Sequence, residues 1–189
     1  YSLNCLNSKE FPKFKLEESK SPLNLKNSEL KEVIFQTSYA ISTQESRPLL
    51  TGINLNIYNN IIKITATDSY RLAKKTIKFN NNIDEEKNIV IPGKNLIELA
   101  KILNDTDETR IDIFTNKIIF RSQNIIFQSN LLSGTYPNIT NLIPTDFEII
   151  LEVNYKEFFD AVDRVSLLTQ NKEKNIIKMQ IEAKNIKLS

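Results

Sequence analysis

The residues of this chain whose types and spacing most suggest a binding site are 67–72, TDSYRL. They directly follow an alternating strand pattern over residues 61–67. The short side chains of Asp68 and Ser69 can hydrogen-bond to their own backbone, which turns the chain sharply. The run therefore predicts a recognition loop at the end of a strand, in which Asp68 forms the turn or pairs with an arginine.

A second run of unusual composition, LLSGTYPNITNLIP, covers residues 131–144. Gly134, Pro137 and Pro144 interrupt apolar residues that a plain loop would not need to carry.

The sequence offers little for catalysis. It has no histidine, which removes the commonest general base and metal ligand, and its single cysteine, Cys5, has no histidine to activate it. Acidic clusters at 84–86 and 105–108 lie in polar connecting stretches, where solvated turns are typical, and the three glycines are isolated, so no phosphate-binding loop is present. We expect no catalytic residue, no metal site and no cofactor.

Composition narrows the class of protein further. With 189 residues, of which 40% are hydrophobic, the chain can bury one good core and part of a second. A net charge of +2 is too small for a protein that grips nucleic acid mainly by neutralising phosphates, so any DNA contact should be loose. The lone cysteine favours a reducing cytoplasm, and the absence of a long apolar window argues against a membrane segment.

Hydrophobic periodicity predicts the same order of elements twice. The first copy has a strand at 23–25, a helix at 29–42 and strands at 51–57, 61–67 and 72–79. The second has a strand at 88–91, a helix at 94–103 and strands at 110–115, 117–122 and 124–132. Each half is therefore a strand, a helix and three strands, which predicts an α+β module with its two helices on one face of antiparallel sheets.

A longer repeat relates the two ends of the chain. Residues 25–34 align with 153–162, and residues 57–64 align with 181–188, so that strand exits, acidic first helical turns and apolar faces coincide. A module of this length has the size of a domain. The alternative is that two strand-helix-strand pieces align by chance.

The two runs together resemble the middle domain of the bacterial DNA polymerase III beta subunit, the replicative sliding clamp. In that family the first run has the form A-T-D-S/G-H-R-L-A, and residues 66–73 here read ATDSYRLA. The second has the form L-x-G-x-[FY]-P-D-x-x-R-[LV]-[IFL]-P, which residues 132–144 follow in most positions. Tyr70 stands where the family has His, and Asn141 where it has Arg, so one cation is missing.

The resemblance implies a sliding-clamp fold and a division of the chain into three parts. Residues 1–21 would be the end of a first clamp domain and its linker, 22–146 a complete middle domain, and 147–189 the N-terminal part of a third. The chain would then be a fragment of a subunit that forms a homodimeric ring at full length.

The implied function is that of a processivity factor of bacterial DNA replication, which tethers DNA polymerase III to an encircled duplex without catalysis. The implied partners are double-stranded DNA, the polymerase alpha subunit, the clamp loader and other proteins with clamp-binding peptides. The alternative is a structural or protein-interaction module of repeated sheet domains with no role on DNA.

The resemblance also implies a pocket for partner peptides. The residues matching it are Leu50, Thr67, Ser69, Tyr70, Arg71, Leu72, Pro137, Asn141 and Leu142. We expect Leu50, Thr67, Leu72, Pro137 and Leu142 to surround one surface depression near the boundary at 146/147, since an apolar site with a few polar groups suits a Leu or Phe anchor. Ordinary sheet core is the alternative for the Thr and Leu positions.

Weak DNA contacts are implied at helix faces and one loop. The candidates are Lys31, Gln44, Arg47, Lys94 and Lys101. Because the helix faces that carry the lysines also carry Glu32 and Glu98, a simple solvated surface explains them equally well.

Overall fold

The computed structural model describes residues 7–11, 15–79, 86–139, 142–169, 176–182 and 185–189. The chain divides into two compact units, residues 1–137 and 138–189. Cys5, Asp84, Glu85 and Asn141, which the sequence analysis singled out, lie outside the described residues.

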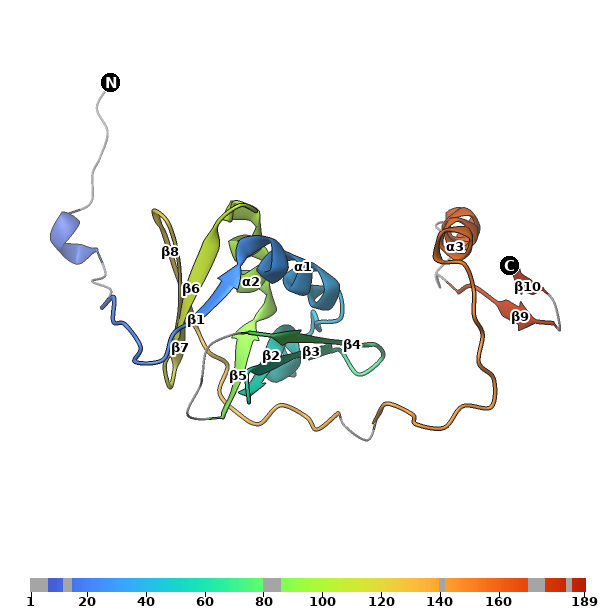
Figure 1. Cartoon of the computed structure of the whole chain (residues 1–189), viewed down its shortest axis with the longest axis horizontal. Helices are drawn as coiled ribbons and strands as arrows, with labels where there is room; N and C mark the ends of the chain where they lie inside the picture. The colour runs from blue at the N-terminus through green and yellow to red at the C-terminus, as the bar shows by residue number, and fades with distance from the viewer. Residues whose placement is uncertain (1–6, 12–14, 80–85, 140–141, 170–175, 183–184) are drawn as a thin grey trace, which may run out of the picture. The chain divides into compact units, whose positions relative to one another are not determined.

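The first unit contains two four-stranded antiparallel sheets (Figure 1). The first sheet has the order β1-β6-β7-β8, from β1 (Leu23–Lys26), β6 (Glu108–Ile113), β7 (Lys117–Ser122) and β8 (Ile125–Asn130). The second has the order β4-β3-β2-β5, from β4 (Leu72–Lys78), β3 (Ile61–Thr67), β2 (Gly52–Tyr58) and β5 (Lys87–Pro92). Short 3₁₀ turns, η1 (Ser8–Glu10) and η2 (Pro48–Thr51), lie at the N-terminus and before β2.

The first strand of each predicted half joins the sheet of the other half. β1 pairs with β6, which places Leu23 opposite Ile111, and β5 pairs with β2, which places Pro92 opposite Gly52. Each sheet therefore contains strands from both halves, and the two halves fold as one unit. The predicted α+β architecture is confirmed, but periodicity alone had not indicated this exchange of strands.

The helices α1 (Asn27–Ser38) and α2 (Gly93–Ile102) pack against each other and against the two sheets. α1 begins two residues before the predicted start, where the buried side chain of Asn27 donates a 2.8 Å hydrogen bond to the carbonyl of Asn104 and accepts one from Thr109. It ends at Ser38, because the amides of Ala40 and Ile41 bond three residues back in a tighter turn. Ala40 and Ile41, which lie within the predicted helix at 29–42, pack on the core from beyond the observed end of the helix.

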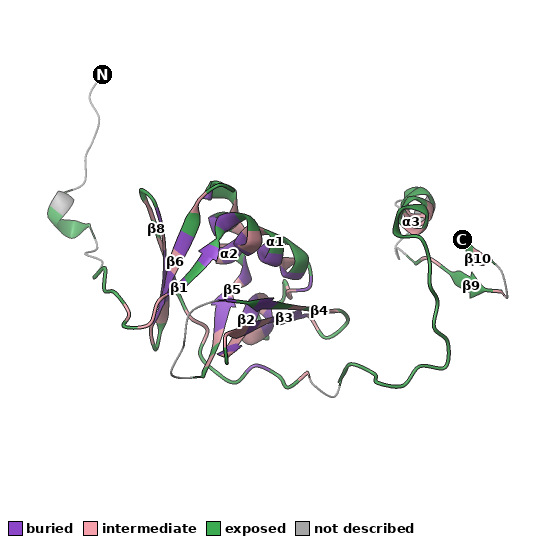
Figure 2. Cartoon of the chain, viewed as in Figure 1, coloured by how far each residue is buried: buried purple, intermediate pink, exposed green. Residues whose placement is uncertain are grey.

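Buried residues of both sheets and both helices form one main core (Figure 2). Alternate residues of the strands point inward, among them Ile53, Ile62 and Ile111, each 3% exposed or less. Leu96 and Leu99 of α2 cover them. Each such side chain contributes roughly 1.5 to 3 kcal/mol by leaving water, so this core accounts for most of the stabilisation of the unit.

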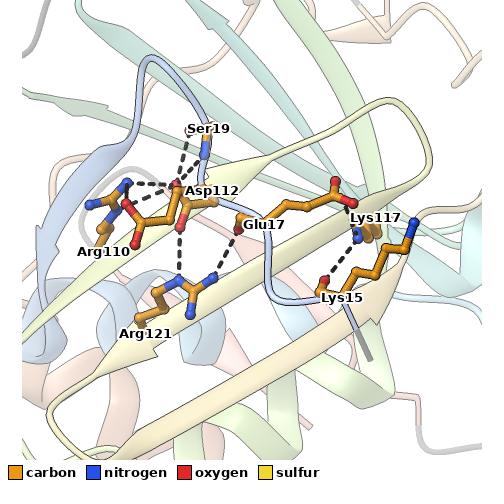
Figure 3. Close-up of polar contacts among 8 residues, drawn as sticks. Lys15, Glu17, Ser19, Arg110, Asp112, Lys117 and Arg121 are labelled. Atoms are coloured by element: carbon orange, nitrogen blue, oxygen red, sulfur yellow. Dashed lines mark hydrogen bonds and ion pairs between the residues drawn. The ribbon is translucent and has the colours of Figure 1, made fainter. Parts of the chain in front are cut away.

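A polar cluster fastens the N-terminal segment to the first sheet (Figure 3). The side chain of Asp112 on β6 is fully buried, and Arg121 and Arg110 donate hydrogen bonds to it at 3.1 and 3.3 Å. The backbone N–H and hydroxyl of Ser19 donate to the same carboxylate at 2.9 and 3.0 Å. Arg121 also donates to the carbonyl of Glu17 at 2.9 Å. The cluster therefore binds a segment that precedes β1 in the chain.

The second unit contains α3 (Tyr155–Thr169) and a hairpin of β9 (Met179–Ile181) and β10 (Ile186–Leu188). Residues 143–154 precede α3 without helix or strand and expose several apolar side chains, such as Phe147 and Ile150. In the described part of the chain, no helix combines the length and the apolar character needed to cross a membrane.

Candidate functional site

The turn between β3 and β4 is built by Asp68. Its carboxylate accepts hydrogen bonds from the backbone N–H groups of Tyr70 and Arg71 at 2.9 and 3.0 Å, and from Nε of Arg71 at 3.0 Å. These bonds hold the pKa of Asp68 below its usual value. The bond from the Arg71 amide has the largest effect, and the bond from the Tyr70 amide has the next largest. Both roles predicted for Asp68, forming the turn and pairing with arginine, are confirmed.

Ser69 occupies a left-handed backbone conformation, with φ of +80°. Non-glycine residues adopt this region at some cost, so its neighbours must hold it. The amide of Ser69 donates to Oγ1 of Thr67 at 3.1 Å, and Arg47 donates to the Ser69 hydroxyl at 3.2 Å. Arg47, named above as a candidate for weak DNA contact, therefore joins the loop before η2 to this turn.

Thr67 connects this turn to the second run. Its hydroxyl donates a 2.7 Å hydrogen bond to the carbonyl of Arg71, and its backbone N–H donates a 3.1 Å bond to the hydroxyl of Tyr136. On β3, Thr65 is the last residue that pairs with β2, so the Thr67 amide lies beyond that ladder. The hydroxyl of Tyr136, in place of a carbonyl of β2, accepts the hydrogen bond from the Thr67 amide.

Tyr136 is buried, and its ring packs with Leu50 and Val90 in a second, smaller apolar cluster. Leu49 and Leu132 cover this cluster, and the Leu132 amide donates to the Val90 carbonyl at 2.9 Å. Burial raises the pKa of the Tyr136 hydroxyl, an effect that the bond from the Thr67 amide partly offsets, so the hydroxyl is neutral at physiological pH.

Gly134 allows the second run to approach η2. Its φ is +130°, and a Cβ atom placed there would lie 2.9 Å from Cδ1 of Leu49. A side chain at this position would meet both backbone strain and a clash. The glycine of the second motif is therefore required by the approach of the run to Leu49.

The exposed residues of this surface lie around the buried ones. Leu50 and Thr67 are only 5% and 6% exposed, whereas Tyr70 is 96% exposed. The guanidinium carbon of Arg71 lies 5.9 Å from the centre of the Tyr39 ring, within cation–π range. Leu50 and Thr67 thus lie beneath the surface, and the side chains available to a partner are mainly Tyr70, Arg71 and the half-buried Leu72.

Five of the nine predicted peptide-site residues are joined by contacts in the first unit. Leu50 meets Thr67 through Tyr136, Thr67 bonds to Ser69 and Arg71, and Leu72 lies opposite Thr67 in the β3–β4 ladder. Tyr70 lies between Ser69 and Arg71 in the chain, Pro137 follows Tyr136, and both are exposed. Leu142 is 66% exposed in the second unit. The depression shared by Leu50 and Leu142 stays a prediction.

Two of the three predicted DNA-facing lysines of the helices, Lys31 and Lys101, have acidic neighbours. Lys31 Nζ lies 2.6 Å from Asp105, and Lys101 Nζ lies 2.6 Å from Glu98. Lys94 on α2 and Gln44 before η2 are exposed. This surface carries mixed charge, which suits at most a weak contact with phosphates.

Sequence reasoning missed the role of Tyr136. The available signal was a tyrosine inside an apolar run punctuated by glycine and proline, since a buried tyrosine hydroxyl usually finds a hydrogen-bond partner. Among the described residues, no group of three or more His, Cys, Asp or Glu side chains is arranged to hold a metal ion.

Two family profiles match the chain. Residues 24–138 match the DNA polymerase III beta subunit, central domain, and residues 140–189 match the C-terminal domain of the same subunit. The chain is 40% identical to the beta sliding clamp of Bacillus subtilis and 41% identical to that of Staphylococcus epidermidis, in each case over all of this chain and 50% of the relative.

Solved structures show the same likeness. The fold superposes on the sliding clamp of Bacillus subtilis with a TM-score of 0.90 at 40% identity, covering 97% of this chain and 49% of that one. For the beta chain of Streptococcus pneumoniae the TM-score is 0.88 at 33% identity, with 97% and 49% covered. The chain thus spans about half the length of the relatives it matches, and the predicted sliding-clamp fold is confirmed.

Proposed function

The chain belongs to the DNA polymerase III beta subunit family, and from that membership we propose that it acts in bacterial DNA replication as part of a processivity factor. In this role a ring encircles duplex DNA and tethers DNA polymerase III to it. Topological linkage retains such a ring, so a net charge of +2 is sufficient and strong phosphate binding would impede sliding. We propose a cytoplasmic protein without catalytic activity.

The proposed division of the chain is the one expected from the sequence: residues 1–21 as linker and end of a first domain, 22–146 as middle domain, and 147–189 as part of a third. The two profiles, which match 24–138 and 140–189, support two consecutive clamp domains. In the proposed assembly, two full-length subunits form the ring.

The second part of the proposal is that the surface around Thr67 docks clamp-binding peptides. The observation that carries it is the hydrogen bond between the Thr67 amide and the Tyr136 hydroxyl, because it joins the two motifs at one place. Apolar groups of Leu72 and Pro137, with Arg71 and Tyr70 beside them, suit a peptide with a Leu or Phe anchor and a polar flank. The proposed peptides come from the polymerase alpha subunit, the clamp loader and other replication proteins.

A peptide titration followed by NMR tests this proposal. The probe is a short peptide with adjacent Leu and Phe anchors, and a scrambled peptide of the same composition is the control. We expect amide shifts to change at residues 67–72 and 131–136, and not at β6 or β7. Binding in the high micromolar range or weaker is sufficient, since only part of a full clamp subunit is present.

The outcomes separate the two functional classes. Shifts confined to the expected residues, and absent with the scrambled peptide, support peptide docking. Equal responses to both peptides, or none at millimolar concentration, would favour the alternative of an interaction module with no replication role.

A further inference from the structure

Tyr136 contacts two residues of the proposed peptide site from beneath. Its ring packs against Leu50, and its hydroxyl accepts the hydrogen bond from the Thr67 amide. It is 7% exposed, so it offers almost no surface of its own to a partner. Its effect on binding would therefore pass through the residues that it holds.

The turn that Tyr136 holds is a chain of linked hydrogen bonds. The Thr67 amide is fixed by Tyr136, the Thr67 hydroxyl then bonds to the Arg71 carbonyl, and the Ser69 amide bonds to the Thr67 hydroxyl. Ser69 has a positive φ, and Arg71 and Tyr70 are the exposed side chains of the turn. A shift in the position of Thr67 would therefore also shift Tyr70 and Arg71, the side chains that are exposed to a partner.

The same residue connects this turn to the second run. Tyr136 follows Gly134 by two positions, and the run is anchored upstream by the bond from the Leu132 amide to the Val90 carbonyl. Without the tyrosine hydroxyl the buried Thr67 amide would lose its acceptor, which is costly for a donor withdrawn from water. The ring alone would still fill the cluster with Leu50 and Val90.

We propose that Tyr136 is a positioning residue for peptide docking, an inference that rests on the proposed function: its hydroxyl sets the place of the turn at residues 67–72 relative to the run at 131–137, and thereby the affinity for the peptide. Tyr136 itself does not contact the peptide.

The variant that tests this is Tyr136→Phe in the whole chain, with Tyr58→Phe as matched control. Tyr58 is at the end of β2, and its replacement by Phe also removes a hydroxyl. The substitution keeps the aromatic ring, whose centre lies 4.8 Å from the amine of Lys63. We expect Tyr136→Phe to weaken binding of the Leu/Phe peptide about 5- to 20-fold and to speed hydrogen exchange at Thr67, Ser69 and Arg71. In Tyr136→Phe, hydrogen exchange at core amides such as Ile119 should stay unchanged. In Tyr58→Phe, both the peptide affinity and the exchange rates should equal those of the wild type.

A double-mutant cycle with Thr67→Val separates positioning from a general loss of stability. Thr67→Val removes the hydroxyl that bonds to Arg71 and Ser69 but keeps the amide. If both groups act through one turn, the double variant should lose clearly less affinity than the product of the two single losses. Strictly multiplicative losses would overturn the proposal.

Further outcomes are distinct. Unchanged affinity in Tyr136→Phe, with the wild type binding, would overturn the inference alone. Faster exchange throughout the core would show a merely structural role and also overturn it. Failure of the wild-type chain to bind the peptide would reject the proposed function, and the inference with it.

Discussion

The backbone N–H and the hydroxyl of Ser19 both donate hydrogen bonds to one oxygen of Asp112, which lies 93 residues further along the chain. The other oxygen accepts from Arg121. Burial by itself raises the pKa of Asp112, but the bonds from Ser19, Arg121 and Arg110 outweigh it, and the net pKa is below the usual value. The carboxylate is thus charged and holds the segment before β1 onto β6 and β7.

The first prediction concerns pH and Asp112. A carboxyl whose pKa is lowered by folding stabilises the protein above its unfolded pKa of about 3.9, and this contribution is lost as pH falls through the folded pKa. We expect Asp112→Asn to lower the free energy of unfolding by about 1 to 3 kcal/mol at pH 7, because the partly buried Arg110 and Arg121 lose their counter-charge. The difference from wild type should shrink below pH 4, as measured by urea unfolding.

Glu98→Gln is the control for this prediction. It removes one partner of an exposed ion pair with Lys101, which should cost no more than about 0.5 kcal/mol at any pH. An Asp112→Asn variant as stable as wild type at pH 7, or a loss that persists unchanged at pH 3, would show that the charge of Asp112 does not contribute to stability.

The second prediction is that Gly134→Ala destabilises the first unit by about 1 to 2 kcal/mol, because an alanine there must adopt a φ of +130° and displace Leu49. Thermal unfolding measures the loss. Ser133→Ala, one position earlier and also exposed, is the matched control and should change stability by less than about 0.5 kcal/mol. Equal stability of the two variants would mean that the run at 131–137 can move away from Leu49 at little cost.

The sequence allowed most elements of the first unit to be placed, because alternation and helical period mark which residues face a core. The predicted strands at 51–57 and 61–67 and the predicted helix at 94–103 are all observed, and the boundaries of strands and helices shift by only a few residues. Hydrophobic periodicity does not indicate which strands pair with each other, so the exchange of β1 and β5 between the two halves could not be predicted. Partner choice depends on contacts between residues far apart in the chain.

Polar residues in the interior were the hardest to predict. Asp112 stands in a strand pattern where an exposed charge is the ordinary reading, and nothing in the local sequence indicates that Ser19 and Arg121 surround it. The position of Tyr136 under Leu50 and Thr67 likewise depends on a long connection. Asp68 was predictable because its partners are two and three residues away.

The third prediction separates the two roles of Asp68. Asp68→Asn keeps a side-chain oxygen for the amides of Tyr70 and Arg71 but loses the ion pair, whereas Asp68→Ala loses both. We expect hydrogen exchange at these two amides to rise about 10-fold or more in Asp68→Ala and no more than about 3-fold in Asp68→Asn. Arg71→Lys, which also keeps the backbone bonds, should behave like Asp68→Asn. A large effect of Arg71→Lys would instead give the main role to the ion pair and to the contact with Tyr39.

The last prediction concerns DNA and the surface of α1 and α2. Because Lys31 lies against Asp105 and Lys101 against Glu98, the wild-type chain should bind duplex DNA weakly, without sequence preference, and less as salt rises. The variant Asp105→Asn with Glu98→Gln removes the acidic partners of both lysines, which takes two negative charges from this surface and raises the net charge by two. It should bind a linear duplex about 3- to 10-fold more tightly at low salt, with a steeper salt dependence, as measured by fluorescence anisotropy.

The control is Glu148→Gln with Glu152→Gln, which changes the net charge equally at exposed positions before α3. Equal gains in both variants would show that net charge alone acts and that α1 and α2 do not face DNA, whereas tight, salt-resistant binding of one linear sequence by the wild type would contradict a clamp.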